Sequence, residues 1–332
     1  MKILVLTQAD IRRVFSMKDA IQADKDAMAA WSRGESIVPL RITFPIEKYG
    51  GTNQYMPAYD AGADAVGVKI VSTFPGNLEK GLPTIPSLVV MVDAATGQPQ
   101  ALLDGTFLTR FRTGALSGAA TDLLAREDSK IAAMFGYGGQ AECQVEAVLT
   151  ARPGIEEFRV YGRNRARLDA FTSRMRETFA GKFRARFVAA ESPEAAVRDS
   201  DVLVLVTTSP TPVIDGSWLK PGVHINAVGS YQPHTREVDE ATILRTDRIY
   251  VDTRDGCLHE AGDLMIPIQE GKLKPTSVAE LGELVIGKVP GRQSPDEITL
   301  FKTVGFGGLD VVNGKRIVDC ALARGGVASI EL

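Results

Sequence analysis

The chain has 332 residues and a mass of 35.7 kDa, enough for two domains of ordinary size. Hydrophobic residues make up 44% and charged residues 24%, and the net charge is −3, so composition favours neither a nucleic-acid nor a membrane-surface partner. The three cysteines are far apart and form no C-x-x-C pair, a pattern typical of a reduced, cytoplasmic chain. The apolar N-terminal stretch ends at Leu6, which is too short for a signal-peptide core, and no run approaches the roughly 18 apolar residues of a membrane span, so we expect neither secretion nor membrane insertion.

The first third of the sequence predicts a mixture of helices and strands. Ser16 and Asp19 resemble a capping box, and apolar residues at helical spacing follow it until Gly34. Two strands and a further helix are predicted after this first helix, at residues 66–71, 88–92 and 113–126.

The middle third alternates between apolar strand patterns and helical patterns. Strands are predicted at residues 130–135, 157–161, 184–188, 201–206, 223–228 and 248–251. Helices are predicted between them at residues 140–150, 165–179 and 193–198. Strands that alternate with helices in this way predict an α/β fold, with a doubly wound parallel sheet covered by helices on both faces.

A glycine-rich turn follows the first strand of this region. The sequence GYGGQA at residues 136–141 has the spacing G-x-G-x-x-A and opens a helix. Gly136 allows the tight turn, Gly138 lets the backbone approach a pyrophosphate, and Ala141 allows close packing of helix and strand. The helix N-terminus adds N–H groups and a partial positive charge. The context therefore predicts a dinucleotide site, although a purely structural turn would also need its glycines.

The end of the second strand bears on which dinucleotide binds. An NAD site usually has an acidic residue there to hold the ribose hydroxyls. This sequence has YGRNR at residues 161–165 instead, and the guanidinium of Arg163 can pair with the 2′-phosphate of NADP. We therefore expect NADP(H) as the preferred cofactor, with NAD(H) also possible. A solvated basic loop is the alternative explanation.

Several motifs in one order resemble the ornithine cyclodeaminase/mu-crystallin family. They are RTGA at 112–115, GYGGQA at 136–141, HINAVG at 224–229, EAGD at 260–263, ELGE at 280–283 and LFKTVG at 300–305. The resemblance implies a homodimer with an α+β substrate-binding and dimerisation domain, built from residues 1–120 and 305–332. It also implies that a Rossmann domain, residues 121–304, is inserted between those two segments.

The resemblance also implies a reaction type. The family includes ornithine and lysine cyclodeaminases, alanine dehydrogenases, ketimine reductases and pyrroline-2-carboxylate reductases. All of them transfer a hydride between a nicotinamide and the α-carbon of an amino or imino acid.

Three basic residues match the substrate-binding positions of the family. Arg41 and Arg112 match its carboxylate-binding arginines, and a planar guanidinium suits a carboxylate. Lys69 lies in an apolar, strand-like stretch, where a lysine is costly unless it is paired or functional. By resemblance, Lys69 contacts the substrate and is the candidate proton donor to the imine nitrogen.

A second set of residues matches positions around the family's cofactor. The set is Thr84, Arg112, Thr113, Gly136, Gly138, Gly139, Gln140, Arg163, Asn164, Arg165, Thr207, Val228, Gly229, Ser230 and Thr303. Ordinary turn and capping roles explain each threonine equally well when it is taken alone.

Two positions depart from the cyclodeaminase pattern. Tyr231 stands where cyclodeaminases carry an aspartate that handles the substrate amine, and Gln54 stands where they tend to have a glutamate. The loss of two carboxylates weakens a site for a second ammonium group and removes the obvious general base. Tyr231 either donates or relays a proton as a catalytic residue or only packs, and Gln54 can hydrogen-bond a neutral group of the substrate.

These observations favour an NAD(P)H-dependent reductase of small imino or ketimine carboxylates, with Δ1-pyrroline-2-carboxylate giving L-proline as the leading example. The alternatives are an ornithine cyclodeaminase, an alanine dehydrogenase and a non-catalytic NADPH-binding protein similar to mu-crystallin. We expect no metal site, because the spacing of the histidines and of Cys257 matches no zinc pattern.

Overall fold

The computed structural model describes all 332 residues and confirms the predicted mixed α/β fold class. The chain divides into two compact units. Met1–Thr113 and Phe306–Leu332 form one, here called the terminal unit, and Gly114–Gly305 forms the other, the central unit. The central unit begins seven residues before the expected boundary at residue 121, which lies inside the helix α3 (Gly105–Leu124).

The terminal unit is built on a mixed sheet. Its strands follow the order β16 (Ala328–Glu331), β1 (Lys2–Leu6), β7 (Pro99–Asp104), β6 (Ser87–Val92), β5 (Ala65–Thr73), β4 (Gly51–Asp60) and β2 (Ser36–Ile37), and β3 (Ile42–Ile46) also pairs with β4. Only β1 and β7 run parallel, and the other pairs are antiparallel. The two ends of the chain therefore meet in one sheet, because β16 pairs with β1.

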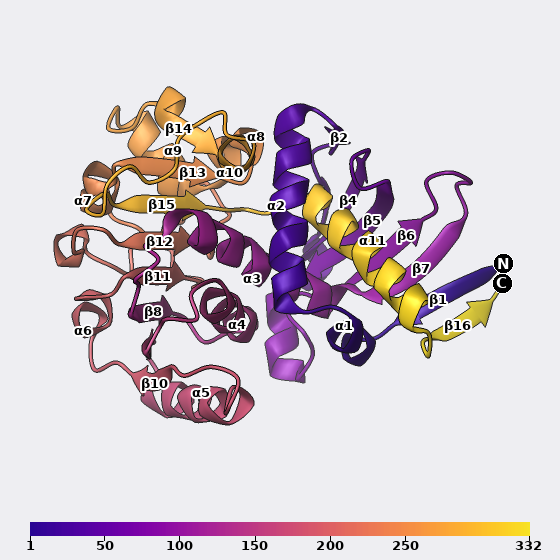
Figure 1. The fold of residues 1–332 in the computed structure, drawn as a ribbon, viewed down its shortest axis with the longest axis horizontal. Coiled ribbons are helices and arrows are strands. Elements are labelled where there is room, and N and C mark those ends of the chain that lie inside the picture. The colour runs from indigo at the N-terminus through magenta and orange to yellow at the C-terminus, as the bar shows by residue number, and fades with distance from the viewer. The chain divides into compact units, whose positions relative to one another are not determined.

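One face of this sheet is covered by helices. The helix α11 (Gly307–Arg324) packs on β4, β5 and β6 and against α2 (Met17–Arg33), as Figure 1 shows. The predicted capping box of α2 is confirmed, since Ser16 Oγ accepts from the backbone N–H of Asp19 and the Asp19 carboxylate accepts from that of Ser16. The helix ends at Gly34, whose φ of 74° is left-handed. The remaining helices are α1 (Gln8–Val14) and the short η1 (Glu47–Tyr49) and η2 (Pro75–Lys80).

The central unit contains the predicted parallel sheet. Its strands follow the order β10 (Arg186–Ala189), β9 (Glu157–Tyr161), β8 (Ile131–Phe135), β11 (Val202–Leu205), β12 (His224–Ala227), β15 (Thr299–Lys302), β13 (Arg248–Val251) and β14 (Val278–Glu280). All seven pairings are parallel. Besides α3, the helices are α4 (Ala141–Ala151), α5 (Arg165–Thr178), α6 (Pro193–Val197), α7 (Glu240–Arg245), α8 (Arg254–Glu260), α9 (Gly262–Gln269), α10 (Leu281–Val285), η3 (Gly216–Trp218) and η4 (Pro275–Ser277).

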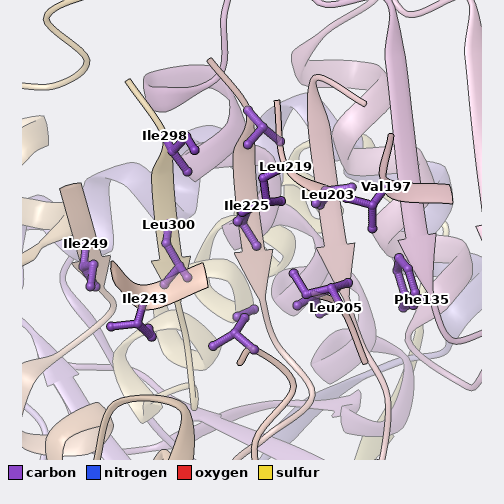
Figure 2. Packing of buried hydrophobic residues seen from close by; sticks show 14 of the residues in the cluster. Phe135, Val197, Leu203, Leu205, Leu219, Ile225, Ile243, Ile249, Ile298 and Leu300 are labelled. Atoms are coloured by element: carbon purple, nitrogen blue, oxygen red, sulfur yellow. The ribbon is translucent and has the colours of Figure 1, made fainter. Parts of the chain in front are cut away.

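The central strands are buried on both faces, and this explains their continuous apolar sequence. Leu203 and Leu205 of β11 belong to a core cluster on one face, which Figure 2 shows with Ile225 and Leu300 of the neighbouring strands. Val202 and Val204 belong to a second cluster that includes Phe158. The C-terminal ends of these parallel strands lie at one edge, where open α/β sheets bind ligands.

The sequence patterns located nine elements of the central unit within about two residues of their observed bounds, namely β8, α4, β9, α5, β10, α6, β11, β12 and β13. The helix α3 begins at Gly105, eight residues before the predicted start at residue 113. Strands β3 and β4 and the helices α7, α8 and α9 are among the elements that were not predicted, because their sequences lack a clear period of two or 3.6 residues. No helix combines the length and the apolar character that crossing a membrane requires.

Candidate active site

A buried cluster of three charged side chains lies in the terminal unit. Lys69 Nζ is 2.7 Å from one carboxylate oxygen of Asp310, and Arg112 Nε donates to the other at 2.9 Å. Lys69 and Arg112 are almost completely buried, and Asp310 has no exposed surface. The structure thus brings together two residues that the sequence analysis placed at the substrate, and it does so through a third residue.

Each member of the cluster comes from a different element. Lys69 lies on the face of β5 that packs against α11, where alternate residues of the strand are buried. Asp310 lies in the first turn of α11, and Arg112 lies on α3. Gly307 starts α11 close to β4, where a Cβ would lie 3.1 Å from the carbonyl oxygen of Pro57. Position 307 therefore accommodates a close approach of α11 to the sheet.

Burial and charge set the ionisation of this cluster. Burial lowers the pKa of Lys69 to about 7, helped by the nearby charge of Arg112 and opposed by Asp310. Burial alone would raise the pKa of Asp310, but Arg112 and Lys69 outweigh burial and lower it. Asp310 is therefore an anion at neutral pH, and Lys69 can either donate or accept a proton there.

The two other substrate candidates lie near this cluster. Gln54 on β4 pairs in register with Val71, two residues beyond Lys69 on β5, so Gln54 and Lys69 share one face of the sheet. Its Nε2 donates to Thr43 Oγ1 at 3.3 Å. Arg41 lies just before β3, and its positive charge contributes to the lowered pKa of Lys69.

Asp310 was missed by the sequence analysis. It is 198 residues from Arg112 in the chain, so no local spacing links the two. The available signal was an acidic residue in a segment that is otherwise apolar and glycine-rich, FGGLDVV at residues 306–312. An acid in such a setting requires a cationic or hydrogen-bonding partner.

Two cofactor candidates also lie in the terminal unit. The half-buried Thr84 precedes β6, and its carbonyl oxygen accepts from the backbone N–H of Phe74 at 2.9 Å. Thr113 follows Arg112 on α3 and is buried.

The glycine-rich turn of the central unit has the geometry that the motif predicts. Gly136 has a φ of 102°, and a Cβ there would lie 2.6 Å from the carbonyl oxygen of Val206. A Cβ on Gly138 would meet nothing within 4 Å, so this glycine faces open space that a ligand can fill. Gly139 and Gln140 complete the turn, and Gln140 as N-cap residue adds no side-chain cap to α4. These features fit a pyrophosphate bound at the start of α4.

The loop after β9 is fixed by Tyr137, a residue that the sequence analysis did not use. The Tyr137 hydroxyl accepts from the backbone N–H of Asn164 at 3.1 Å and lies 3.3 Å from its carbonyl oxygen. A Cβ on Gly162 would collide with the Tyr137 ring, so any larger residue there would displace this ring. The Asn164 side chain caps α5. Tyr137 thus holds the second strand end against the glycine-rich turn.

The two arginines of this loop differ in their surroundings. Arg165 pairs with Asp169 at 3.0 Å and with Glu191 at 3.3 Å. Arg163 is exposed and makes no ion pair. Its guanidinium therefore remains available for an anionic ligand.

The other cofactor candidates lie where β11, β12 and β15 end, and buried acids hold their backbone. Glu237 accepts from the backbone N–H groups of Thr207 and Gly229, each at 2.6 Å. Asp252 accepts from the Thr303 hydroxyl at 2.6 Å and from the N–H groups of the two following residues. Neither acid was predicted, since no local spacing links Glu237 to Thr207, 30 residues away, or Asp252 to Thr303, 51 residues away.

The remaining candidates of the loop after β12 vary in exposure. Val228 continues the strand pairing, because its backbone N–H donates a hydrogen bond to the carbonyl oxygen of Leu205. Ser230 is buried, and its hydroxyl donates to the carbonyl oxygen of Thr235 at 2.6 Å. Tyr231 is 45% exposed, and its catalytic role stays a prediction.

Together, the parallel sheet and the glycine-rich turn after β8 define a dinucleotide-binding fold of the Rossmann type. The model of the ornithine cyclodeaminase/mu-crystallin family matches residues 1–325. The chain belongs to this family, and the resemblance described above is confirmed.

Three relatives cover nearly the whole chain. The Δ1-pyrroline-2-carboxylate reductase of Bacillus cereus is 36% identical over 329 residues, which are 99% of each chain. The structure of Δ1-pyrroline-2-carboxylate reductase from Thermococcus litoralis, in complex with NADH and L-proline, is 38% identical and covers 99% of this chain and 100% of its own, with a TM-score of 0.93. An archaeal alanine dehydrogenase dimer with bound NAD is 32% identical and covers 100% of this chain and 99% of its own, with a TM-score of 0.88.

These relatives are all oxidoreductases by name, and the expected enzyme class is confirmed at that level. The two solved structures contain NADH or NAD. They therefore support a nicotinamide cofactor for the family without favouring NADP.

The central position of Asp310 yields a stability prediction. Asp310→Asn leaves Lys69 and Arg112 facing each other in a buried site, so we expect it to lower the free energy of unfolding by about 3–5 kcal/mol. Asp319→Asn on the same helix, where Asp319 pairs with Lys315 at the surface, should change it by less than about 1 kcal/mol. Urea denaturation followed by circular dichroism measures both, and equal effects of the two variants would contradict the structural role of Asp310.

Proposed function

We propose that this protein reduces a small 2-imino or cyclic ketimine carboxylate with a nicotinamide dinucleotide, and that Δ1-pyrroline-2-carboxylate is the leading substrate. The buried Lys69–Asp310–Arg112 cluster carries this proposal. It offers two cations and one anion, so it favours a ligand with one negative charge. The names of the two pyrroline-2-carboxylate reductases that match the full chain support the same substrate class.

The substrate carboxylate is assigned to the arginines. Arg112 uses its Nε for Asp310, which leaves the two Nη groups to bind a carboxylate. Arg41 adds a second positive charge near Lys69. Gln54, a neutral side chain on the same sheet face as Lys69, can hydrogen-bond an uncharged part of the substrate.

Lys69 is proposed to supply the proton. Reduction of a C=N bond adds a hydride to carbon and a proton to nitrogen, and the π electrons of that bond form the new N–H bond. With a pKa near 7, the Lys69 ammonium group can donate this proton and recover it from water. Asp310 orients the ammonium group and keeps a negative charge beside it.

The cofactor is proposed to bind the central unit. The open space at Gly138 and the uncapped start of α4 fit a pyrophosphate, and the ends of β11, β12 and β15 provide Thr207, Gly229 and Thr303. When bound, the reduced dinucleotide supplies the hydride.

The reaction is tested by following NADPH and NADH oxidation with Δ1-pyrroline-2-carboxylate, Δ1-piperideine-2-carboxylate, or pyruvate plus ammonia. We expect oxidation of the cofactor with a cyclic imine. In Lys69→Met the rate of this oxidation should fall by about 100-fold or more, because the variant side chain has no proton to donate. Dinucleotide binding should be unchanged in this variant.

The same assay separates the alternatives. Turnover with pyruvate and ammonia alone would indicate an alanine dehydrogenase. Proline and ammonia formed from ornithine and NAD, without imine reduction, would indicate a cyclodeaminase. Tight NADPH binding without any turnover would indicate a non-catalytic binding protein.

Lys69 also predicts a pH dependence within this reaction. The donor form is the ammonium ion, which is lost as the pH rises through about 7. We therefore expect kcat/KM for the imine to fall by about tenfold per pH unit well above pH 7, since kcat/KM reports ionisations of the free enzyme and substrate. A rate that stays constant to pH 9 would exclude Lys69 as the proton donor.

We also propose that NADP(H) is preferred over NAD(H). The support is Arg163, an exposed and unpaired guanidinium at the end of β9, where NAD-binding domains usually carry an acid.

This preference predicts the effect of Arg163→Ala. Loss of charge-assisted bonds to the 2′-phosphate should lower kcat/KM for NADPH by about 10–100-fold and leave that for NADH within about threefold. Arg174→Ala removes the same charge from the exposed side of α5 and should change neither value. An unchanged ratio of NADPH to NADH activity in Arg163→Ala would refute this role of Arg163.

We further propose that two copies pair through the uncovered face of the terminal sheet. Ile42, Tyr55, Ile70 and Leu88 are cross-strand neighbours on β3, β4, β5 and β6, on the face opposite α11. Ile42 is 54% and Leu88 40% exposed, and Phe44, which packs on Tyr55, is also exposed. A contiguous apolar surface of this kind marks a protein interface. The dimeric archaeal alanine dehydrogenase supports a second copy as the partner.

The pairing predicts the mass in solution. Light scattering after gel filtration should give twice the 35.7 kDa chain mass for the natural protein and a single chain for Leu88→Lys, because burying an unpaired lysine is costly. Leu244→Lys, at an exposed leucine of α7, should remain dimeric. A natural protein that elutes as a single chain at micromolar concentration would contradict the pairing.

A further inference from the structure

A buried carboxylate joins two of the strand ends that the proposed dinucleotide site uses. Glu237 lies in the loop after β12 and has no exposed surface. Its Oε1 accepts from the backbone N–H of Thr207, after β11, at 2.6 Å. Its Oε2 accepts from Gly229 at 2.6 Å and from Ser230 at 3.3 Å, both after β12. One side chain therefore spans two neighbouring loops.

The close approach of these loops depends on glycine. A Cβ on Gly229 would collide with the backbone of Thr207 and lie 2.6 Å from Glu237 Oε1. Position 229 accordingly has no space for a side chain. The Glu237 carboxylate, which accepts hydrogen bonds from the loops after β11 and β12, sets the distance between them.

A second buried acid and a lysine hold Glu237 in place. Asp263, in the first turn of α9, accepts from the backbone N–H groups of Glu237 at 2.6 Å and Val238 at 3.1 Å. Lys302 on β15 lies 2.9 Å from Asp263. Lys302 has no exposed surface and Asp263 almost none, so a continuous set of buried charges connects β15 with the loops after β11 and β12.

We propose that Glu237 is a positioning residue for the nicotinamide dinucleotide, whose ionised carboxylate fixes the relative position of the Thr207 and Gly229–Ser230 loops and thereby sets dinucleotide affinity. This inference rests on the proposed cofactor site. Glu237 itself is buried beneath the loops and acts through their backbone. The ionised form is required, because protonation places a donor on one of the two oxygens that accept from backbone N–H groups.

The surroundings of Glu237 make its ionisation sensitive to pH near neutrality. Burial raises its pKa to about 7, Lys302 opposes this shift and Asp263 adds to it. The Cys257 thiol, another titratable group near Lys302, has its pKa raised by burial and stays neutral. Protonation of Glu237 as the pH falls below about 7 turns one acceptor into a donor that faces a backbone N–H, so dinucleotide affinity should fall with it.

The experiment measures the Kd for NADH by fluorescence, with no substrate present, from pH 5.5 to 8.5. NADH is chosen because it lacks the 2′-phosphate, which itself titrates near pH 6. We expect Glu237→Gln to raise the Kd at pH 8 by about 10–100-fold. The amide NH2 group of glutamine would face a backbone N–H, so two donors would meet where the carboxylate makes a charge-assisted hydrogen bond. We also expect the natural protein to bind more weakly below pH 7, and this dependence to be absent in the variant.

Two further variants control for a purely structural effect. Glu240→Gln makes the same change three residues away, at an exposed side chain paired with Lys272, and should leave the Kd unchanged. Glu237→Asp keeps the charge on a shorter side chain and should recover part of the affinity. If circular dichroism shows that Glu237→Gln does not fold, Glu237→Asp serves as the test variant. Its affinity for NADH must then still fall below pH 7.

The outcomes separate the two proposals. Normal NADH binding by a folded Glu237→Gln variant at all pH values would overturn the positioning role and leave the proposed function intact. Failure of the natural protein to bind either NADH or NADPH would overturn the proposed function, and this inference with it. A loss of affinity with the same pH dependence as the natural protein would assign the effect to packing and overturn the role of ionisation.

Discussion

The feature on which the terminal unit depends is the Asp310 carboxylate between two buried cations. Isolated charges are costly to bury, and Asp310 makes the burial of both Lys69 and Arg112 feasible. The pairing also fixes three elements relative to one another, because β5, α3 and α11 each contribute one member. The charges still do not balance, since one carboxylate faces two cations. The cluster thus keeps an excess of positive charge that an incoming carboxylate can neutralise.

Buried acids also provide hydrogen-bond partners in the central unit. Parallel strands that end at a ligand-binding edge leave backbone N–H groups without partners from the sheet. Glu237 and Asp252 accept from these groups after β11, β12 and β15. In both units, a buried acid therefore positions the groups around it. In the terminal unit Asp310 pairs with Lys69 and Arg112, and in the central unit Glu237 and Asp252 hold the backbone of loops.

The sequence was sufficient to predict features that depend on local geometry. The capping box at Ser16 and the turn at Gly136 involve residues within a few positions of one another, and both are present as predicted. The parallel sheet was predictable because strands buried on both faces are apolar throughout, as β11 is. These features can be predicted without knowing how distant segments of the chain pack.

The residues that were missed act across long sequence separations. Asp310 meets Arg112 over 198 residues, and Glu237 reaches back 30 residues to Thr207. No periodicity marks such pairs, and an acid in an apolar segment shows only that some partner is required. Tyr137 was overlooked for a different reason. It occupies the variable second position of the G-x-G-x-x-A motif, and its contact with Asn164 depends on how the loops after β8 and β9 pack.

The balance of charge also bears on the choice between reduction and cyclodeamination. A cyclic imino acid brings one carboxylate to a site with an excess of cations, and the attraction between them favours binding. Ornithine brings an additional ammonium group to the same surroundings, near Lys69, Arg112 and Arg41. Gln54 offers that group no negative charge, and Tyr231 is a neutral phenol in place of an aspartate. The second ammonium group of a diamino acid would then lack a counter-charge from these two positions, whereas an imino acid needs none. The same substitutions that remove a base for deamination thus leave the proton donor for reduction, Lys69, in place.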